Sequence, residues 1–207
     1  MRGGACLAIA AVMLGGCASE TYYKKPESAP LARVRFVGSG ASHDGILVTQ
    51  FESPNCELGS SGGIMGVVGG IGSRAPIPLP GAPEHVRETG NTQQMIGFSA
   101  ALGPAPLERP VAAGRDFIFT LRRTMNTWVS IGLPTTWTCT ITRQFTPRPG
   151  EQYEVVYVES ALDEKTSKPG CAVRIDRLQA ATDGPVRRLP EPSFRPAPQL
   201  CAPGAVK

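Results

Sequence analysis

The sequence predicts an all-β protein: an antiparallel β-sandwich-like domain with Gly/Pro-rich loops and a Pro-rich C-terminal arm. Three observations lead to this fold class. Several segments alternate apolar and polar residues with the period of two that is typical of half-buried strands. Glycine (24) and proline (20) together exceed a fifth of the 207 residues, a density that interrupts helices and favours turns. The strand-like segments number about six to eight, are short, and leave almost no room for helices.

The first two strands are expected directly after the start of the domain at residue 32. RVRFV (33–37) alternates polar and apolar side chains, and ILVTQF (46–51) is rich in β-branched residues. A loop rich in Gly, Ser and Asp separates the two segments. We therefore expect two strands with a loop between them.

A glycine-rich segment, GSSGGIMGVVGGIGS (59–73), follows the second strand and places Gly62, Gly66 and Gly70 four residues apart. We interpret it as a mobile loop between strands. The alternative is a glycine zipper, because this spacing permits close packing of helices. The segment lacks the lysine that completes a phosphate-binding loop.

The alternation becomes clearer in the second half of the chain. A weak strand is expected at 93–100, followed by a proline-rich link at 104–114 and a strand at 115–123. Three further strands are predicted at TWTCTITRQF (136–145), QYEVVYVES (152–160) and CAVRIDRL (171–178). In the first of these three, Trp137, Cys139, Ile141 and Phe145 share one face. We interpret residues 136–178 as an antiparallel meander.

The two ends of the chain are expected to lie outside this domain, which spans residues 32–180. Residues 17–31 are polar, contain two prolines and are interpreted as a tether. Tyr22 and Tyr23 in this tether are expected either to be exposed or to dip into a lipid headgroup layer. Residues 181–207 are polar and proline-rich, and are interpreted as an arm with little ability to bury side chains.

The first 16 residues have the features of a secretory signal peptide. Arg2 supplies a positive charge, and the apolar stretch from Ala5 to Leu14 is about ten residues, too short to span a bilayer. The stretch ends in Leu14-Gly15-Gly16-Cys17, which resembles a bacterial lipobox. The alternatives are a signal peptide without lipidation and a buried N-terminal helix in which the cysteine occurs by chance.

This resemblance implies that Cys17 receives a diacylglycerol and that residues 1–16 are removed. It also implies that the new amine is acylated, for instance with palmitate. Ala18, in place of the aspartate that retains enterobacterial lipoproteins at the inner membrane, implies the outer membrane, with the domain facing the periplasm.

Four cysteines remain after Cys6 leaves with the signal and Cys17 takes lipid, namely Cys56, Cys139, Cys171 and Cys201. An even set in an exported chain predicts disulfides. Cys139 and Cys171 both fall on the apolar sides of their strands, so we favour that pair, which leaves Cys56–Cys201. Neighbours across one intervening strand are too far apart to bond, so the last strand would have to lie on the facing sheet.

The sequence offers little for catalysis or cofactor binding. The only histidines are His43 and His85, and no C-x-x-C pair suggests a metal site, so neither metal nor cofactor is expected. No G-x-S-x-G elbow is present, and we predict that the protein is not an enzyme. Without residues 1–16 the chain has 20 Lys+Arg against 17 Asp+Glu, a charge of +3, and no basic cluster that would suggest nucleic-acid binding.

Residues 110–178 resemble the core of small bacterial lipoproteins of unknown function. Within this range the resemblance rests on a Cys-bearing strand, a turn marked by Phe145, Pro147, Gly150 and Tyr153, and a last strand with Cys171 and Val173. The lipobox-like motif at residues 14–17 is a further shared feature. It implies no activity. We therefore expect a lipid-anchored cell-envelope protein of binding or structural type, in contact with the membrane and with another envelope protein or the cell wall. The alternatives are an accessory lipoprotein of a secretion or transport assembly and, third, an envelope hydrolase.

Overall fold

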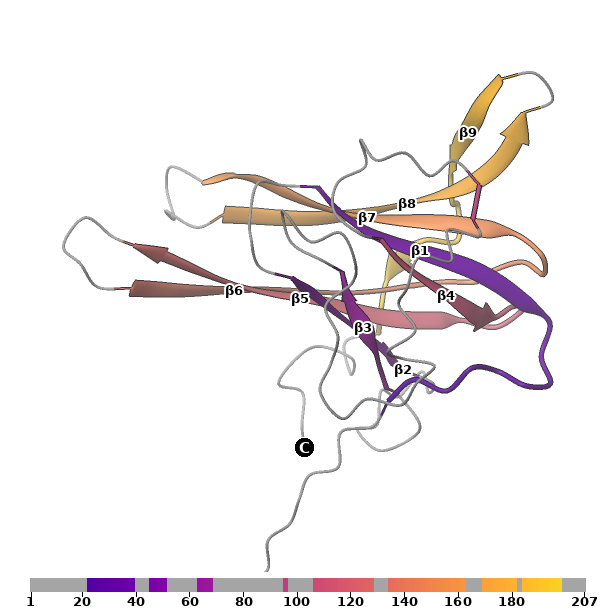
Figure 1. Cartoon of the computed structure of the whole chain (residues 1–207), viewed down its shortest axis with the longest axis horizontal. Coiled ribbons are helices and arrows are strands. Elements are labelled where there is room, and N and C mark those ends of the chain that lie inside the picture. Colours follow the sequence, from indigo (N-terminus) through magenta and orange to yellow (C-terminus); the bar gives the residue numbers. More distant parts are fainter. Residues whose placement is uncertain are drawn as a thin grey trace, which may run out of the picture.

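The computed structural model describes residues 22–39, 45–51, 63–68, 95–96, 106–128, 134–162, 169–181 and 184–198. Every regular element in these ranges is a β-strand, and the strands form two five-stranded sheets that pack face to face (Figure 1). Apolar side chains from both sheets meet between the layers. The all-β, sandwich-like fold predicted from the sequence is therefore confirmed.

The two sheets are named here after one central strand of each. The β1 sheet contains, in spatial order, β4 (Leu107–Ala112), β1 (Leu31–Ser39), β7 (Gln152–Leu162), β8 (Pro169–Ala181) and β9 (Gly184–Pro190). The β5 sheet contains β10 (Arg195–Pro196), β6 (Pro134–Phe145), β5 (Phe117–Trp128), β2 (Ile46–Phe51) and β3 (Ile64–Val68). Neighbouring strands are antiparallel, apart from the parallel pair β1 and β7.

The core is centred on aromatic side chains that alternate along their strands with outward-facing residues. Phe119 of β5 packs edge-on against Phe36 of β1, with ring centroids 5.6 Å apart. The ring centroids of Phe145 of β6 and Tyr153 of β7 lie 5.0 Å apart. All four side chains are fully or almost fully buried, and burial of a side chain of this size stabilises the fold by about 1.5–3 kcal/mol. These contacts join the two sheets across their centre.

The chain changes sheets between β6 and β7, so the predicted meander of residues 136–178 is wrong. Only its second half, the β7–β8 hairpin, is present. The connection contains Pro147 and Pro149, which have no N–H to donate to a ladder, and Gly150 with a φ of 75°. Its six residues can span about 20 Å, which is enough to cross the roughly 10 Å between packed sheets.

Part of the predicted glycine-rich mobile loop is a strand. Residues 64–68 form β3, in which Met65 and Val68 are buried. A Cβ added to Gly66 would lie 2.8 Å from Leu107 Cδ1, so glycine here provides room for a neighbouring side chain. The remaining residues of 59–73, apart from Gly63, lie outside the described ranges.

The predicted proline-rich link at 104–114 contains β4, an edge strand of the β1 sheet. Pro110 is compatible with this position because an edge strand needs ladder donors on one side only. Arg109 is 5% exposed and donates from Nε to the Met65 carbonyl oxygen of β3, at 2.9 Å. Burial lowers the pKa of Arg109 to about 10, which leaves it charged at neutral pH.

The C-terminal arm predicted at 181–207 contributes a strand to each sheet, so the domain does not end at residue 180. β9 pairs with β8, and β10 pairs with β6. Between them, the Glu191 amide donates to the Ile175 carbonyl oxygen, at 3.2 Å, and the Thr146 amide donates to Ser193 Oγ, at 3.1 Å. This segment therefore ties the sheets together at one end of the sandwich.

The predicted tether is also part of the folded domain from Tyr22 onward. Tyr23 is 3% exposed, which excludes both the exposed and the headgroup positions expected for it. Its amide donates to the Ile64 carbonyl oxygen, at 3.1 Å, and its hydroxyl donates to the Pro110 carbonyl oxygen. Because Ile64 is in β3 and Pro110 is in β4, Tyr23 bridges the adjacent edges of the two sheets.

A mostly buried group of charges lies on the outer face of the β1 sheet. Arg35 has no exposed surface and lies level with Glu108 on β4 and Glu154 on β7. It donates from Nε to Glu108 Oε1, at 2.9 Å, and from Nη1 to Glu154 Oε2, at 3.2 Å. Arg188 of β9 donates to the other oxygen of Glu154, at 2.8 Å. Two arginines thus balance two glutamates, and we call these four residues the Arg35 network.

The Arg35 network also holds a separate segment against the sheet. Arg35 donates from Nη2 to the Met95 carbonyl oxygen, at 2.8 Å, and from Nη1 to the Ile96 carbonyl oxygen, at 3.1 Å. The Ile96 amide in turn donates to Gln152 Oε1, at 2.8 Å. One side chain therefore connects three strands and the 95–96 segment directly, and β9 through Glu154.

Replacement of Arg35 by methionine is expected to lower the free energy of unfolding by about 3–5 kcal/mol, because Glu108 and Glu154 would stay buried with less opposite charge. Urea unfolding followed by circular dichroism measures the loss. Arg122→Met is the control, since Arg122 is an exposed strand residue whose replacement should change stability by less than about 0.5 kcal/mol. Equal losses in the two variants would contradict the role given to Arg35.

Candidate functional site

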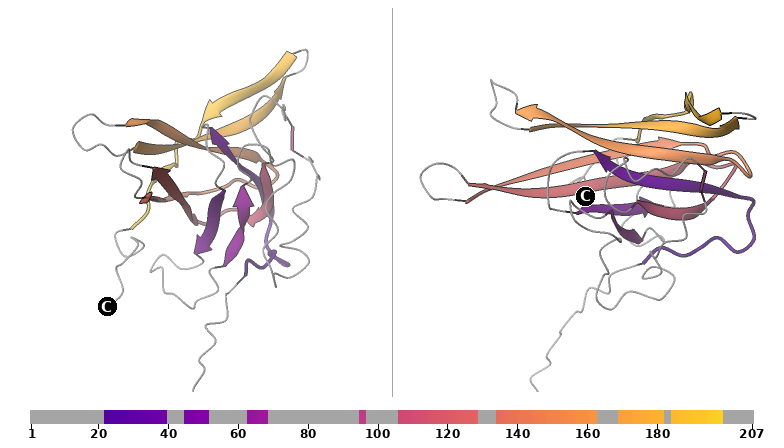
Figure 2. Two further views of the ribbon diagram at one scale, coloured as in Figure 1. Left: turned by 60° about the vertical axis from the view of Figure 1, so that its left-hand side comes forward. Right: turned by 45° about the horizontal axis from the view of Figure 1, so that its top comes forward.

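Two long hairpins dominate one end of the sandwich. β5 and β6 pair as far as Trp128 and Pro134, and β7 and β8 pair as far as Leu162 and Pro169. Figures 1 and 2 show that both hairpins extend past the ends of the other strands, on the same side of the molecule. One hairpin belongs to each sheet, so the place where they are joined is the candidate site.

A disulfide joins the two hairpins. Cys139 of β6 and Cys171 of β8 are bonded, with Cα atoms 6.5 Å apart, inside the usual range of about 4.4–6.8 Å. The sequence favours this pair because both cysteines lie on the apolar sides of their strands. The bond requires Cys171 to lie on the sheet that faces β6. This requirement is met because β7 and β8 both belong to the β1 sheet, opposite β6.

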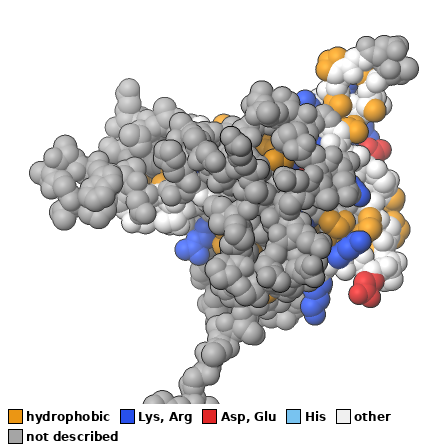
Figure 3. All heavy atoms as spheres, viewed as in Figure 1, with side chains coloured by type: hydrophobic (Ala, Val, Ile, Leu, Met, Phe, Trp, Pro, Cys, Tyr) orange, Lys and Arg blue, Asp and Glu red, His pale blue; other side chains and the backbone are white. Residues whose placement is uncertain are grey.

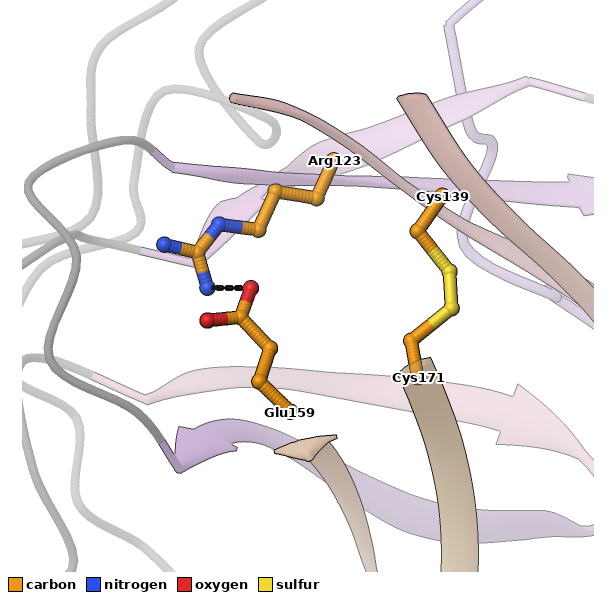
Figure 4. Close-up of a disulfide and its surroundings, with 4 residues drawn as sticks. All are labelled: Arg123, Cys139, Glu159 and Cys171. Atoms are coloured by element: carbon orange, nitrogen blue, oxygen red, sulfur yellow. Dashed lines mark ion pairs between the residues drawn. A yellow bond between two sulfur atoms is a disulfide. The ribbon is translucent and has the colours of Figure 1, made fainter. Parts of the chain in front are cut away.

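An ion pair lies next to the disulfide and bridges the same two hairpins (Figure 4). Arg123 is the register partner of Cys139, and Glu159 is the register partner of Cys171. Nη1 of Arg123 contacts Oε1 of Glu159, and their side chains are 4% and 14% exposed. We call the four residues Arg123, Cys139, Glu159 and Cys171 the hairpin clamp.

The charges of the hairpin clamp also act on a neighbouring tyrosine. Burial and the carboxylate of Glu159 raise the pKa of Tyr157 to about 12, against the opposing effect of Arg123. The phenol is therefore neutral at physiological pH. Among the described residues, Nε and Nη2 of Arg123 have no hydrogen-bond partner although they are buried, and leaving such donors unpaired costs about 1–3 kcal/mol.

This arrangement is suited to fixing a distance. A covalent bond and a mostly buried ion pair span the layers side by side, and neither partner of the pair can leave without uncovering a charge. The two hairpins are therefore held at constant separation near the point from which they project. A surface fixed in this way loses little conformational entropy when a partner binds to it.

The other cysteines and histidines singled out from the sequence lie outside the described residues. These are Cys17, Cys56, Cys201, His43 and His85. Lipidation of Cys17 and a Cys56–Cys201 bond therefore stay predictions. In the ranges that the structure describes, no three His, Cys, Asp or Glu residues gather to hold a metal ion, and no helix has the length and apolar character to cross a membrane.

The sequence contains a signal for the Arg123–Glu159 pair of the hairpin clamp that the predictions above do not include. Arg123 continues the apolar series Phe117, Phe119 and Leu121, and Glu159 continues the buried series that ends at Tyr157. A charge at an inward position requires a partner when it is buried. Opposite charges at inward positions of two strands therefore predict an ion pair, once the strands are assigned to facing sheets.

Comparison with known proteins does not extend this description. No protein family, no curated protein and no solved structure matches the chain. The resemblance of residues 110–178 to small bacterial lipoproteins stays a prediction from the sequence.

Removal of the disulfide by the double change Cys139→Ser and Cys171→Ser is expected to lower the free energy of unfolding by about 3–4 kcal/mol, because the bond closes a loop of about 32 residues. Guanidinium unfolding without reductant measures the difference. A control with only Cys56→Ser and Cys201→Ser replaced separates this bond from any other cross-link. An unchanged midpoint in the Cys139/Cys171 variant would contradict a structural role for the bond.

Proposed function

We propose that the protein is a lipid-anchored module of the bacterial cell envelope that binds or stabilises another envelope component and catalyses no reaction. Cys17 is its lipidation site, and residues 1–16 are its signal peptide. The outer membrane is the proposed location, on the basis of Ala18. The partner is another envelope protein or the cell wall.

The observation that carries this proposal is the disulfide between the sheets. Disulfides form and persist in oxidising compartments such as the periplasm, whereas cytosolic thiols are kept reduced. Cys139 and Cys171 are bonded in the fold, and the same chain starts with a positive residue, an apolar stretch and a lipobox-like motif. The two features are independent, and both support export.

The hairpin clamp supports binding as the mode of action. The β5–β6 and β7–β8 hairpins project together and are cross-linked through Cys139 and Cys171. A projecting surface with a fixed spacing suits recognition of a partner, because its order exists before binding. We place the partner-binding surface on these hairpins.

An accessory role in a secretion or transport assembly is the second candidate, and the edge strand β9 supports it. β9 pairs with β8 on one side only, and most of its side chains are exposed. A strand of this kind can accept a further strand from another protein. Affinity purification from solubilised membranes separates the candidates, since an assembly subunit brings partners down in fixed stoichiometry.

Replacement of Cys17 by serine is expected to leave residues 1–16 attached and to remove the protein from the outer-membrane fraction, because no acyl chain can be added and the uncleaved precursor is not exported to that membrane. Mass spectrometry of the N-terminal peptide and fractionation of cells measure both effects. Cys6→Ser is the matched control, since it removes a thiol from the signal itself and should leave processing intact. Normal processing and fractionation of the Cys17 variant would contradict the proposal.

A further inference from the structure

We infer that the sandwich lies directly on the phospholipid headgroups of the membrane that anchors it, with the Tyr22–Lys25 segment and the adjacent edge of the sandwich, strands β3 and β4, facing the membrane. This inference rests on the proposed lipid anchor at Cys17. It adds an orientation and an interaction surface to that proposal. The partner of this surface is the phospholipid headgroup layer.

The argument starts from the place where the N-terminal segment joins the fold. Tyr22 forms a parallel bridge with Ile64, and the Tyr23 ring is buried between β3 and β4. Two hydrogen bonds, from the Tyr23 amide to Ile64 and from its hydroxyl to Pro110, fix this residue to both edges. The chain is therefore held by the domain from Tyr22 onward.

Gly63 makes this attachment possible. A Cβ added to Gly63 would lie 2.3 Å from the carbonyl carbon of Tyr22 and from the amide nitrogen of Tyr23. Both atoms are backbone atoms that cannot rotate away, so a larger residue would displace the segment. The close approach of two backbones indicates a specific attachment of the N-terminal segment to the domain.

Only a short stretch of chain is left between the lipid and this attachment. Residues 18–21 separate Cys17 from Tyr22, so the two Cα atoms are at most about 18 Å apart. A compact domain of this size has a radius of gyration of about 16 Å and a diameter of about 40 Å. Because the tether is shorter than the domain is wide, the edge that carries Tyr22 stays next to the bilayer.

The charges next to Tyr22 are compatible with this position. Lys24 and Lys25 are exposed, and Glu27 offsets one of the two charges. Figure 3 shows blue basic side chains and a red acidic one at the lower right of the described surface, where the N-terminal segment runs in Figure 1. A lysine at an anionic surface contributes about 1 kcal/mol, so the short tether sets the orientation and the lysines add to it.

Energy transfer to the membrane tests the orientation. The acylated full-length protein is placed in vesicles of phosphatidylcholine and phosphatidylglycerol that contain an acceptor-labelled lipid. One donor dye is attached to a cysteine introduced either as Ser28→Cys, in the N-terminal segment, or as Arg187→Cys, in β9. β9 is the edge of the β1 sheet opposite β4, so position 187 is the matched control.

Transfer from position 28 is expected to be about twofold more efficient than from position 187, because the domain diameter of about 40 Å separates the near and far edges. An insertion of about 12 Gly and Ser residues between Thr21 and Tyr22 lengthens the tether and should remove most of the difference. Acylated protein with equal transfer from the two positions would overturn the orientation alone. Protein without an acyl chain would overturn the lipid anchor as well.

Discussion

The fully buried guanidinium of Arg35 is the interaction on which the rest of the β1 sheet depends. A charge without access to water requires opposite charge and hydrogen-bond acceptors on several sides. Glu108, Glu154 and two backbone carbonyl groups meet this requirement, and they come from segments far apart in the sequence. Glu154 then holds Arg188 of β9. The position of one side chain thus fixes which strands lie beside β1 and which segment covers them.

Two kinds of interaction hold the two sheets together: hydrogen bonds at the β3 and β4 edges, and a disulfide with an ion pair at the hairpins. On the side of β3 and β4, Arg109 and Tyr23 donate hydrogen bonds to backbone carbonyl groups of the neighbouring edge strands. At the hairpins, the Cys139–Cys171 disulfide and the Arg123–Glu159 pair span the layers. The first side attaches the N-terminal segment, and the second fixes the projecting hairpins. The attachment of the N-terminal segment at Tyr22 and Tyr23 and the proposed binding surface therefore belong to the same sandwich.

The fold class could be predicted from the sequence because apolar and polar residues alternate in segments such as 33–37 and 136–142. The Cys139–Cys171 bond followed from the same alternation. The pairing of strands could not be predicted, because it depends on contacts distant in sequence: the parallel β1–β7 pair and the change of sheet after Phe145 have no local signal. The Gly- and Pro-rich segments 59–73 and 104–114 were predicted to be a loop and a link, but they contain the strands β3 and β4. Whether such segments form strands also depends on residues distant in sequence. At Gly66, glycine admits a neighbouring side chain to the core.

Native-state hydrogen exchange of individual amides tests most directly whether the Arg35 network makes the β1 sheet a single cooperative unit. The account predicts that the paired amides of β1, β4, β7 and β9 exchange with one common free energy of opening, equal to that of global unfolding. The two edge strands, β4 and β9, decide the question. Opening of their amides at free energies several kcal/mol below those of β1 and β7 would contradict the account, because those strands would then be attached to the domain without being held by its central charges.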